Sequence, residues 1–130
     1  MALVRDFVDE LRDHLRLDEE KCFDLNLVLE EAVTNVINYA YTDGGEHTFT
    51  LDAAEKGGTL TLTLTDDGVP FDPTAAPDPD VSLPAEERPI GGLGIFLIRQ
   101  LMELVFYERR DGKNVLTMTT SCNRTTLTNL

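Results

Sequence analysis

The chain has 130 residues and a formal net charge of −13, a length that suits one domain with a single core and leaves little room for a second. Its hydrophobic content of 42% and charged content of 27% are typical of a soluble globular protein. No apolar run approaches the roughly 18 residues that cross a bilayer, and the first residues lack the pattern of a secretion signal. We therefore expect one cytoplasmic domain, residues 1–130, that makes no membrane contact.

The charge and the few reactive side chains narrow the function classes further. A net charge of −13 is repelled by a phosphate backbone, which argues against direct nucleic-acid binding. Cys22 and Cys122 stand far apart with no histidine near either, so neither a zinc knuckle nor a redox pair is indicated. His14 and His47 belong to no Ser/His/Asp or Cys/His arrangement.

The hydrophobic pattern changes from helical to strand periodicity along the chain. The predicted elements are, in order, helices at 3–15 and 18–41, strands at 46–55 and 59–66, a helix at 92–103, and strands at 104–109 and 114–120. Glycine-containing turns join each pair of strands into a hairpin. We therefore predict an α+β fold, a two-layer sandwich in which about three helices cover one face of a mostly antiparallel sheet.

The segment from Pro70 to Pro89 contains all six prolines and little periodic hydrophobicity. Loops longer than about 12 to 15 residues are uncommon in small domains and are usually functional or disordered. We expect a mobile lid at about 70–90. The alternative is an inert insertion, which the glycine-rich helix start after the segment makes less attractive.

A polar stripe follows one side of the second predicted helix. Glu31, Asn35 and Asn38 are spaced four and three residues apart, next to the apolar face of that helix. The side-chain oxygen of Asn35 suits Mg²⁺ whose other ligands are triphosphate oxygens and water, and Glu31 can accept a proton from an attacking hydroxyl. For an isolated Glu-x-x-x-Asn pair, the commoner explanation is the solvated side of an amphipathic helix.

Asp66-Asp67-Gly68 closes the second predicted strand. A carboxylate fixed at a strand end, which we assign to Asp66, can accept a hydrogen bond from the adenine amino group, and Gly68 permits close approach of the base. Guanine carries an oxygen at that position and is disfavoured. The alternative is an ordinary turn of the kind that Asp and Gly form.

Gly91-Gly92-Leu93-Gly94 opens the third predicted helix. Without bulky side chains, the backbone N–H groups can reach phosphate oxygens, and the helix dipole adds favourable potential. Arg88, the only lid cation, is a candidate to close over the γ-phosphate. The alternatives are a flexible exit from the lid and a solvated arginine.

Together these stretches resemble the motifs of the GHKL superfamily of ATP-binding domains, and within it the bacterial anti-sigma-factor serine/threonine kinases. Residues 31–35 are similar to the N box, 66–68 to the first glycine box and 91–96 to the second. The resemblance extends over almost the whole chain. It implies a Bergerat fold that binds ATP and magnesium between the second helix and the lid.

The resemblance also implies roles and partners. Asn35 would hold the metal, Asp66 would contact adenine and Glu31 would act as the base. The implied reaction phosphorylates a serine or threonine on an anti-anti-sigma partner of the STAS type, and the kinase alternately sequesters a sigma factor. A homodimer, which is usual among such relatives, is left open.

The sequence departs from the family pattern at several positions. The family usually has a strand ahead of the first helix, whereas this sequence starts at the helix, so we expect an open sheet edge. Tyr39 stands where histidine is frequent, and Pro70 stands where glycine is frequent. An ATP-gated module that sequesters a partner without phosphotransfer is therefore the alternative to a kinase. A histidine kinase would need an acceptor-bearing helical hairpin, which the sequence does not suggest.

Overall fold

A computed structural model describes residues 2–41, 47–75 and 92–122. The elements are, in order, α1 (Ala2–Leu15), α2 (Glu19–Asn35), a π-helix η1 (Val36–Ala40), β1 (Phe49–Lys56), β2 (Thr59–Asp66), a 3-10 helix η2 (Pro73–Ala75), α3 (Gly92–Leu101), β3 (Leu104–Arg110) and β4 (Lys113–Ser121). The predicted order of helices and strands is confirmed. No helix within these ranges combines the length and apolarity of a membrane span.

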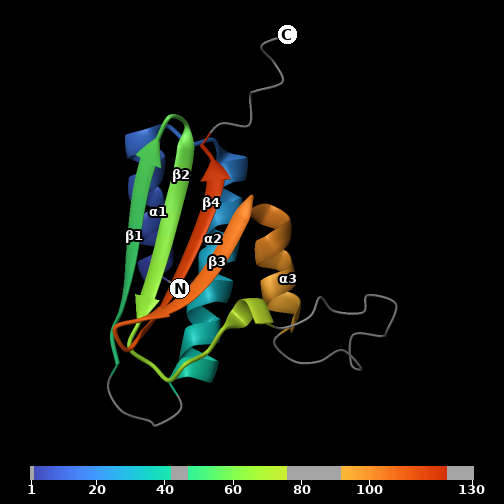
Figure 1. The fold of residues 1–130 in the computed structure, drawn as a ribbon. Helices are drawn as coiled ribbons and strands as arrows, with labels where there is room; N and C mark the ends of the chain where they lie inside the picture. Colours follow the sequence, from blue (N-terminus) through green and yellow to red (C-terminus); the bar gives the residue numbers. More distant parts are fainter. Residues whose placement is uncertain (1, 42–46, 76–91, 123–130) are drawn as a thin grey trace.

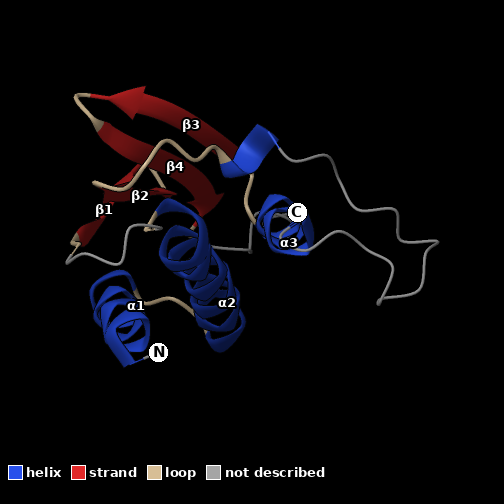
Figure 2. Ribbon diagram, turned by 90° about the horizontal axis from the view of Figure 1, so that it is seen from below, coloured by secondary structure: helices blue, strands red, loops and turns tan. Residues whose placement is uncertain are grey.

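The strands β1 to β4 form one antiparallel sheet in the order β1-β2-β4-β3. Figure 1 shows the sheet in front of α1 and α2, with α3 beside β3, and Figure 2 shows all three helices on the same side of the sheet. The predicted two-layer α+β sandwich is therefore confirmed. Each of β1 and β3 has one neighbour among the described strands, so both are sheet edges there.

Two tight turns set the register of the β1–β2 and β3–β4 hairpins. Gly57 and Gly58 have φ of +60° and +87°, and Asp111 and Gly112 have φ of +54° and +76°. Positive φ at both central residues is the geometry of a type I′ hairpin, which matches the twist of the flanking strands. The pairing of β2 with β4, which no turn connects, places Asn114 opposite Asp66.

The inner face of β2 carries the sheet side of the core. Leu60, Leu62 and Leu64 have at most 1% of their surface exposed, and Asp66 occupies the next inward position with 4% exposed. The helices complete the core with Val4, Val8, Leu25, Val28, Leu29, Ala32, Val33, Ile95 and Ile98. The strand that builds the core therefore also delivers a carboxylate to the end of its buried face.

The sequence pattern predicted one regular helix from residue 18 to residue 41, and this prediction is wrong for the last turn. The α-helical part ends at Asn35, and the following turn, Val36–Ala40, is a π-helix. Single π turns are uncommon and occur frequently at functional sites. Here the Ala40 carbonyl oxygen at the end of the turn accepts a hydrogen bond of 2.9 Å from Val69 N. The helix end is thus tied to the loop that follows β2.

We expect Leu62→Ala to lower the free energy of unfolding by about 3 kcal/mol, because it removes a fully buried side chain from the central strand. Thr63→Ala on the opposite face of the same strand is the control, with an expected change below about 1 kcal/mol. Urea denaturation of both variants measures the difference. Equal losses would contradict the inward orientation of Leu62.

Candidate functional site

Several sequence-predicted residues meet beside the C-terminal end of α2. A pocket there takes its lining from α2, η1, β2, the loop after β2, β3 and β4; its residues are Ala32, Asn35, Val36, Leu64, Asp66, Phe71, Pro73, Tyr107, Asn114 and Leu116. The start of α3 lies next to it, because a Cβ on Gly94 would be 2.8 Å from Glu31 Oε2 and 3.7 Å from Asn35 Nδ2. The fold thus brings Glu31, Asn35, Asp66 and Gly94 together.

Two side chains of α2 lie beside the start of α3 without a hydrogen-bond partner among the described residues. Asn35 has 7% of its surface exposed, yet no described residue forms a hydrogen bond with its carboxamide, and Glu31 likewise has no hydrogen bond or ion pair with a described residue. No buried side-chain nitrogen or oxygen of the described residues lacks a hydrogen-bond partner, so the unpaired Asn35 carboxamide keeps some contact with solvent. It is therefore available to an external ligand or metal ion.

The side chains at this site fit a metal ion whose coordination is completed mainly by water and phosphate oxygens. Among the described residues, no group of three His, Cys, Asp or Glu side chains could hold a metal ion. Mg²⁺ in nucleotide sites is commonly bound by only one or two protein groups, with water and phosphate oxygens completing its octahedron. The Asn35 carboxamide oxygen can serve as such a protein ligand.

The Asp66 carboxylate is held by one of its oxygens. Its Oδ1 accepts hydrogen bonds from Gly68 N at 2.9 Å and from Asn114 Nδ2 at 2.8 Å. No described residue donates to Oδ2. The fixed carboxylate therefore keeps one acceptor oxygen for a ligand that carries a hydrogen-bond donor.

Asn114 and Arg109 hold this loop, and the sequence pattern had singled out neither of them. Asn114 Nδ2 donates to Val69 O at 2.8 Å as well as to Asp66, and Arg109 Nη1 donates to Gly68 O at 2.8 Å. The sequence does carry one sign of Asn114, because this polar residue occupies a position of β4 at which the alternating pattern predicts an apolar side chain. Such a residue is a site candidate only once its cross-strand partner is known.

The second acid of this motif points elsewhere. Asp67 Oδ1 lies 3.1 Å from His47 Nδ1, and the Tyr41 ring stacks on the His47 ring with 4.2 Å between centroids. Burial, with a smaller contribution from the neighbouring Asp66 and Asp67, raises the pKa of Tyr41 to about 12, so its hydroxyl remains a donor to Thr48 O. Asp66 is therefore the acid that reaches the pocket.

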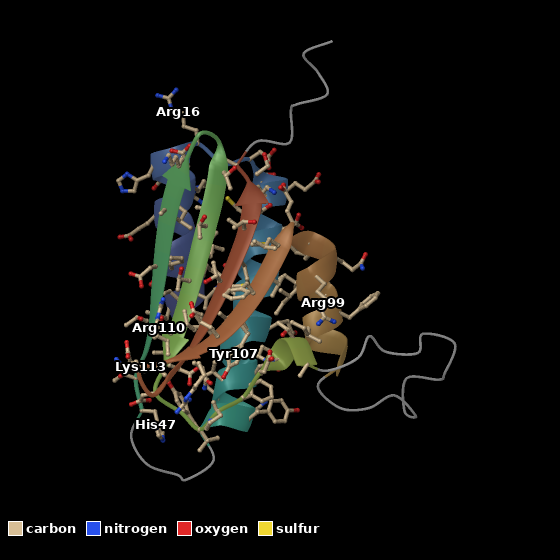
Figure 3. All side chains as sticks on the ribbon, in the orientation of Figure 1. Arg16, His47, Arg99, Tyr107, Arg110 and Lys113 are labelled. Carbon is tan, nitrogen blue, oxygen red and sulfur yellow. The ribbon has the colours of Figure 1, made fainter. Side chains whose placement is uncertain are left out.

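The segment after the loop covers the pocket. The Phe71 ring stacks on Tyr39 with 5.2 Å between centroids, Pro73 is buried, and Arg99 donates to a carbonyl of η2. Figure 3 shows Arg99 on α3 and Tyr107 on β3 on two sides of η2. The remaining cavity volume is about 20 Å³, room for about one water molecule. A purine ring does not fit in this volume.

The remaining candidate residues are not placed in the pocket. Asn38 is exposed on η1 and does not line it, because the π turn changes the angular step between Asn35 and Asn38. Arg88 and Gly91, like most of the expected lid, lie outside the described residues. Gly92 is the first residue of α3, and the side chain of Leu93 is outside the described part. Their roles stay predictions.

Known proteins place this arrangement in a family. Residues 1–120 match the family described as the histidine kinase-like ATPase domain. The chain belongs to this family. The expectation of a GHKL-type domain is confirmed, and the ligand of the family is ATP.

The sequence relatives are protein kinases. The serine/threonine-protein kinase BtrW of Bordetella bronchiseptica is 34% identical over 97 residues, which are 75% of this chain and 68% of that protein. The serine-protein kinase RsbW of Halalkalibacterium halodurans is 32% identical over 123 residues, 92% of this chain and 74% of that protein. RsbW of Bacillus cereus is 32% identical over 121 residues. The predicted class, an ATP-dependent protein kinase, is confirmed.

Solved structures support the fold alone. The histidine kinase domain of the blue-light activated histidine kinase from Erythrobacter litoralis EL346 has a TM-score of 0.57 and 20% identity, and the chain covers 45% of it. A structure of the blue-light activated kinase itself has a TM-score of 0.62 and 18% identity, and the chain covers 33% of it. The chain thus spans less than half the length of either structure.

We expect Gly68→Ala to lower the free energy of unfolding by about 2 kcal/mol and to weaken ATP binding, because the new Cβ would lie 2.5 Å from the Ala40 carbonyl oxygen. Gly94→Ala is the control for stability alone, since its Cβ would be 2.8 Å from Glu31 Oε2, the far end of a flexible side chain, and 3.7 Å from Asn35 Nδ2. Thermal unfolding compares the two variants, and ATP titration is applied to Gly68→Ala. Equal stability losses would contradict the close backbone approach at Gly68.

Proposed function

We propose that this chain is a magnesium-dependent protein kinase that transfers the γ-phosphoryl group of ATP to a serine or threonine of an anti-anti-sigma partner of the STAS type. In the alternate state it would sequester a sigma factor and so regulate transcription. The relatives named serine kinases support this activity. The observation that carries it is the pair formed by Glu31 and Asn35, which have no partner among the described residues and lie beside Gly94, while Asp66 lines the same pocket as Asn35.

Asp66 suits adenine rather than guanine. The Oδ2 atom of Asp66 is a hydrogen-bond acceptor and can bind the amino group of adenine. Guanine would place its carbonyl oxygen, a second acceptor, against Oδ2. Gly68 lets the loop that carries Asp66 lie against the end of η1, because a Cβ there would be 2.5 Å from the Ala40 carbonyl oxygen. Selection of ATP over GTP would follow from this contact.

The triphosphate would extend from the base toward α2 and the start of α3. Magnesium, when bound, neutralises phosphate charge and orients the γ-phosphoryl group. Asn35 would contribute one oxygen ligand to the metal. Backbone N–H groups at the start of α3, which begins at Gly92, point along the helix dipole and favour an anion. These local dipoles and the metal would offset the −13 charge of the chain.

Glu31 is the proposed base. As the hydroxyl oxygen of the partner's serine or threonine forms a bond to the γ-phosphorus, the bond from that phosphorus to the bridging oxygen of ADP breaks, and Glu31 takes the hydroxyl proton. Its carboxylate is free of ion pairs with described residues, so it is available to accept a proton. The products are ADP and a phosphorylated partner.

A second candidate is an ATP-gated module that binds a partner without chemistry. The altered motifs favour it, since Tyr39 stands where histidine is frequent in the family and Pro70 stands where glycine is frequent. Incubation with labelled ATP, Mg²⁺ and anti-anti-sigma proteins separates the two functions. Stoichiometric phosphoserine or phosphothreonine on the partner excludes the binding module.

We expect Glu31→Gln to slow phosphotransfer by about 100-fold or more, the usual contribution of a general base, while the Kd for ATP changes by less than about threefold. Glu30→Gln is the matched control, because Glu30 lines a different hollow, shared by α2 and Arg5 of α1, and its substitution should leave the rate unchanged. Single-turnover phosphotransfer and ATP titration measure the two quantities. An unchanged rate in Glu31→Gln would remove the proposed base.

We expect the protein to bind ATP at least about tenfold more tightly than GTP, since one buried acceptor contact is involved. Magnesium should strengthen ATP binding, and Asn35→Ala should remove most of that dependence. Calorimetric titrations of each nucleotide with Mg²⁺ and with EDTA test both points. Equal affinity for the two nucleotides would argue against Asp66 as the base contact.

A further inference from the structure

The amide nitrogen of Asn114 has no unused hydrogen. The residue is 4% exposed, and Nδ2 donates to Asp66 Oδ1 and to Val69 O, each at 2.8 Å. An amide nitrogen carries two hydrogens, so both are engaged. One of them fixes the position of a carboxylate oxygen, and the other fixes the backbone three residues later.

The amide oxygen of Asn114 is also engaged. Oδ1 accepts from Tyr107 Oη at 2.6 Å, from Arg109 Nη1 at 3.1 Å and from Phe71 N at 3.2 Å. Burial raises the pKa of Tyr107, which keeps its hydroxyl protonated as a donor. A flipped amide would face these three donors with N–H groups. The network therefore permits one orientation of the Asn114 side chain.

The loop after β2 is therefore hydrogen-bonded at several successive residues to side chains of the β3–β4 hairpin. Asn114 holds Asp66, Val69 and Phe71, and Arg109 holds Gly68 through its carbonyl oxygen at 2.8 Å. Both side chains come from the β3–β4 hairpin, more than 40 positions along the chain from the loop. The hairpin thus determines where the Asp66 carboxylate lies and which of its oxygens is left over.

We infer that Asn114 and Arg109 are positioning residues that set the selectivity of the site for adenine over guanine by holding Asp66 with Oδ2 toward the base. The inference rests on the proposed function for the identity of the ligand. Because Oδ1 already accepts two hydrogen bonds, Oδ2 alone meets the ligand, and it acts there purely as an acceptor. A carboxylate released from Asn114 can rotate and loses this fixed discrimination between an amino group and a carbonyl.

A merely structural role for Asn114 predicts a different result. A loosened loop would weaken binding of ATP and GTP to the same extent. A positioning role acts through Asp66 and therefore weakens ATP binding while leaving GTP binding nearly unchanged. The ratio of the dissociation constant for GTP to that for ATP separates these explanations, because only a positioning role lowers it.

The test is a double-mutant cycle on that ratio, with Asn114→Ala, Asp66→Asn and the double variant titrated with ATP and with GTP in Mg²⁺. We expect Asn114→Ala to weaken ATP binding by about tenfold and GTP binding by less than about threefold. In the Asp66→Asn background, Asn114→Ala should leave the ratio unchanged. Thermal unfolding of each variant verifies that it is folded at the titration temperature.

Two substitutions outside the loop serve as matched controls. Thr120→Ala removes another buried polar group of β4, whose hydroxyl accepts from Lys21 Nζ at 3.0 Å, and should not alter the ratio. Arg110→Gln removes the exposed neighbour of Arg109, which pairs with Glu108, and should also have no effect. Arg109 is exposed, so the protein should tolerate Arg109→Gln. This substitution should lower the ratio as Asn114→Ala does. If Asn114→Ala does not fold, Arg109→Gln tests the positioning role in its place.

The outcomes distinguish this inference from the proposed function. A wild-type protein that does not prefer ATP would overturn the proposed base contact itself. A selective wild-type protein whose ratio survives both Asn114→Ala and Arg109→Gln would overturn the positioning role and leave the proposed function intact. A ratio that falls further when Asn114→Ala is added to Asp66→Asn would also overturn it, because the effect would then not pass through Asp66.

Discussion

The site depends on the contact between Asp66 and Asn114 across the β2–β4 ladder. Both residues lie on the inner face of the sheet at 4% exposure, where a carboxylate is costly unless it is hydrogen-bonded. Asn114 supplies that bond, and Gly68 N supplies a second. The arrangement uses one carboxylate oxygen for the protein and leaves the other for a ligand, so the same contacts that make burial tolerable also orient the acid.

The two halves of the site differ in how their polar groups are satisfied. Around Asp66 and Asn114 nearly every donor and acceptor is engaged within the protein, which fixes the geometry before a ligand arrives. On α2, Glu31 and Asn35 have no partner among the described residues. The first half suits recognition of a rigid base, and the second suits a metal, phosphate groups and a hydroxyl that enter during the reaction. Hydrogen-bonded groups held in place around Asp66, together with polar groups on α2 that are available to a ligand, fit the proposed phosphotransfer site.

The solved structures show only the fold, whereas the sequence relatives bear on the function. The solved structures with the same fold are histidine kinase domains at or below 20% identity, and the relatives above 30% identity are named serine or serine/threonine kinases. Because one fold can carry several chemistries, the acceptor is argued from the site rather than from the fold. In the proposed reaction, Glu31 would be the base that a hydroxyl acceptor requires, and Asn35 next to it would be the metal ligand.

The sequence by itself determined the elements, their order and the hairpin turns, because periodicity and positive-φ residues are local signals. It also determined that Asp66 continues the inward face of β2 and that Glu31 and Asn35 lie one helical turn apart. The tertiary structure decided that Asn114 would meet Asp66, because a period of two fixes the face of a residue but not its partner on another strand. It likewise decided the π turn that removes Asn38 from the pocket, since that turn is tied to a backbone contact with the distant loop after β2.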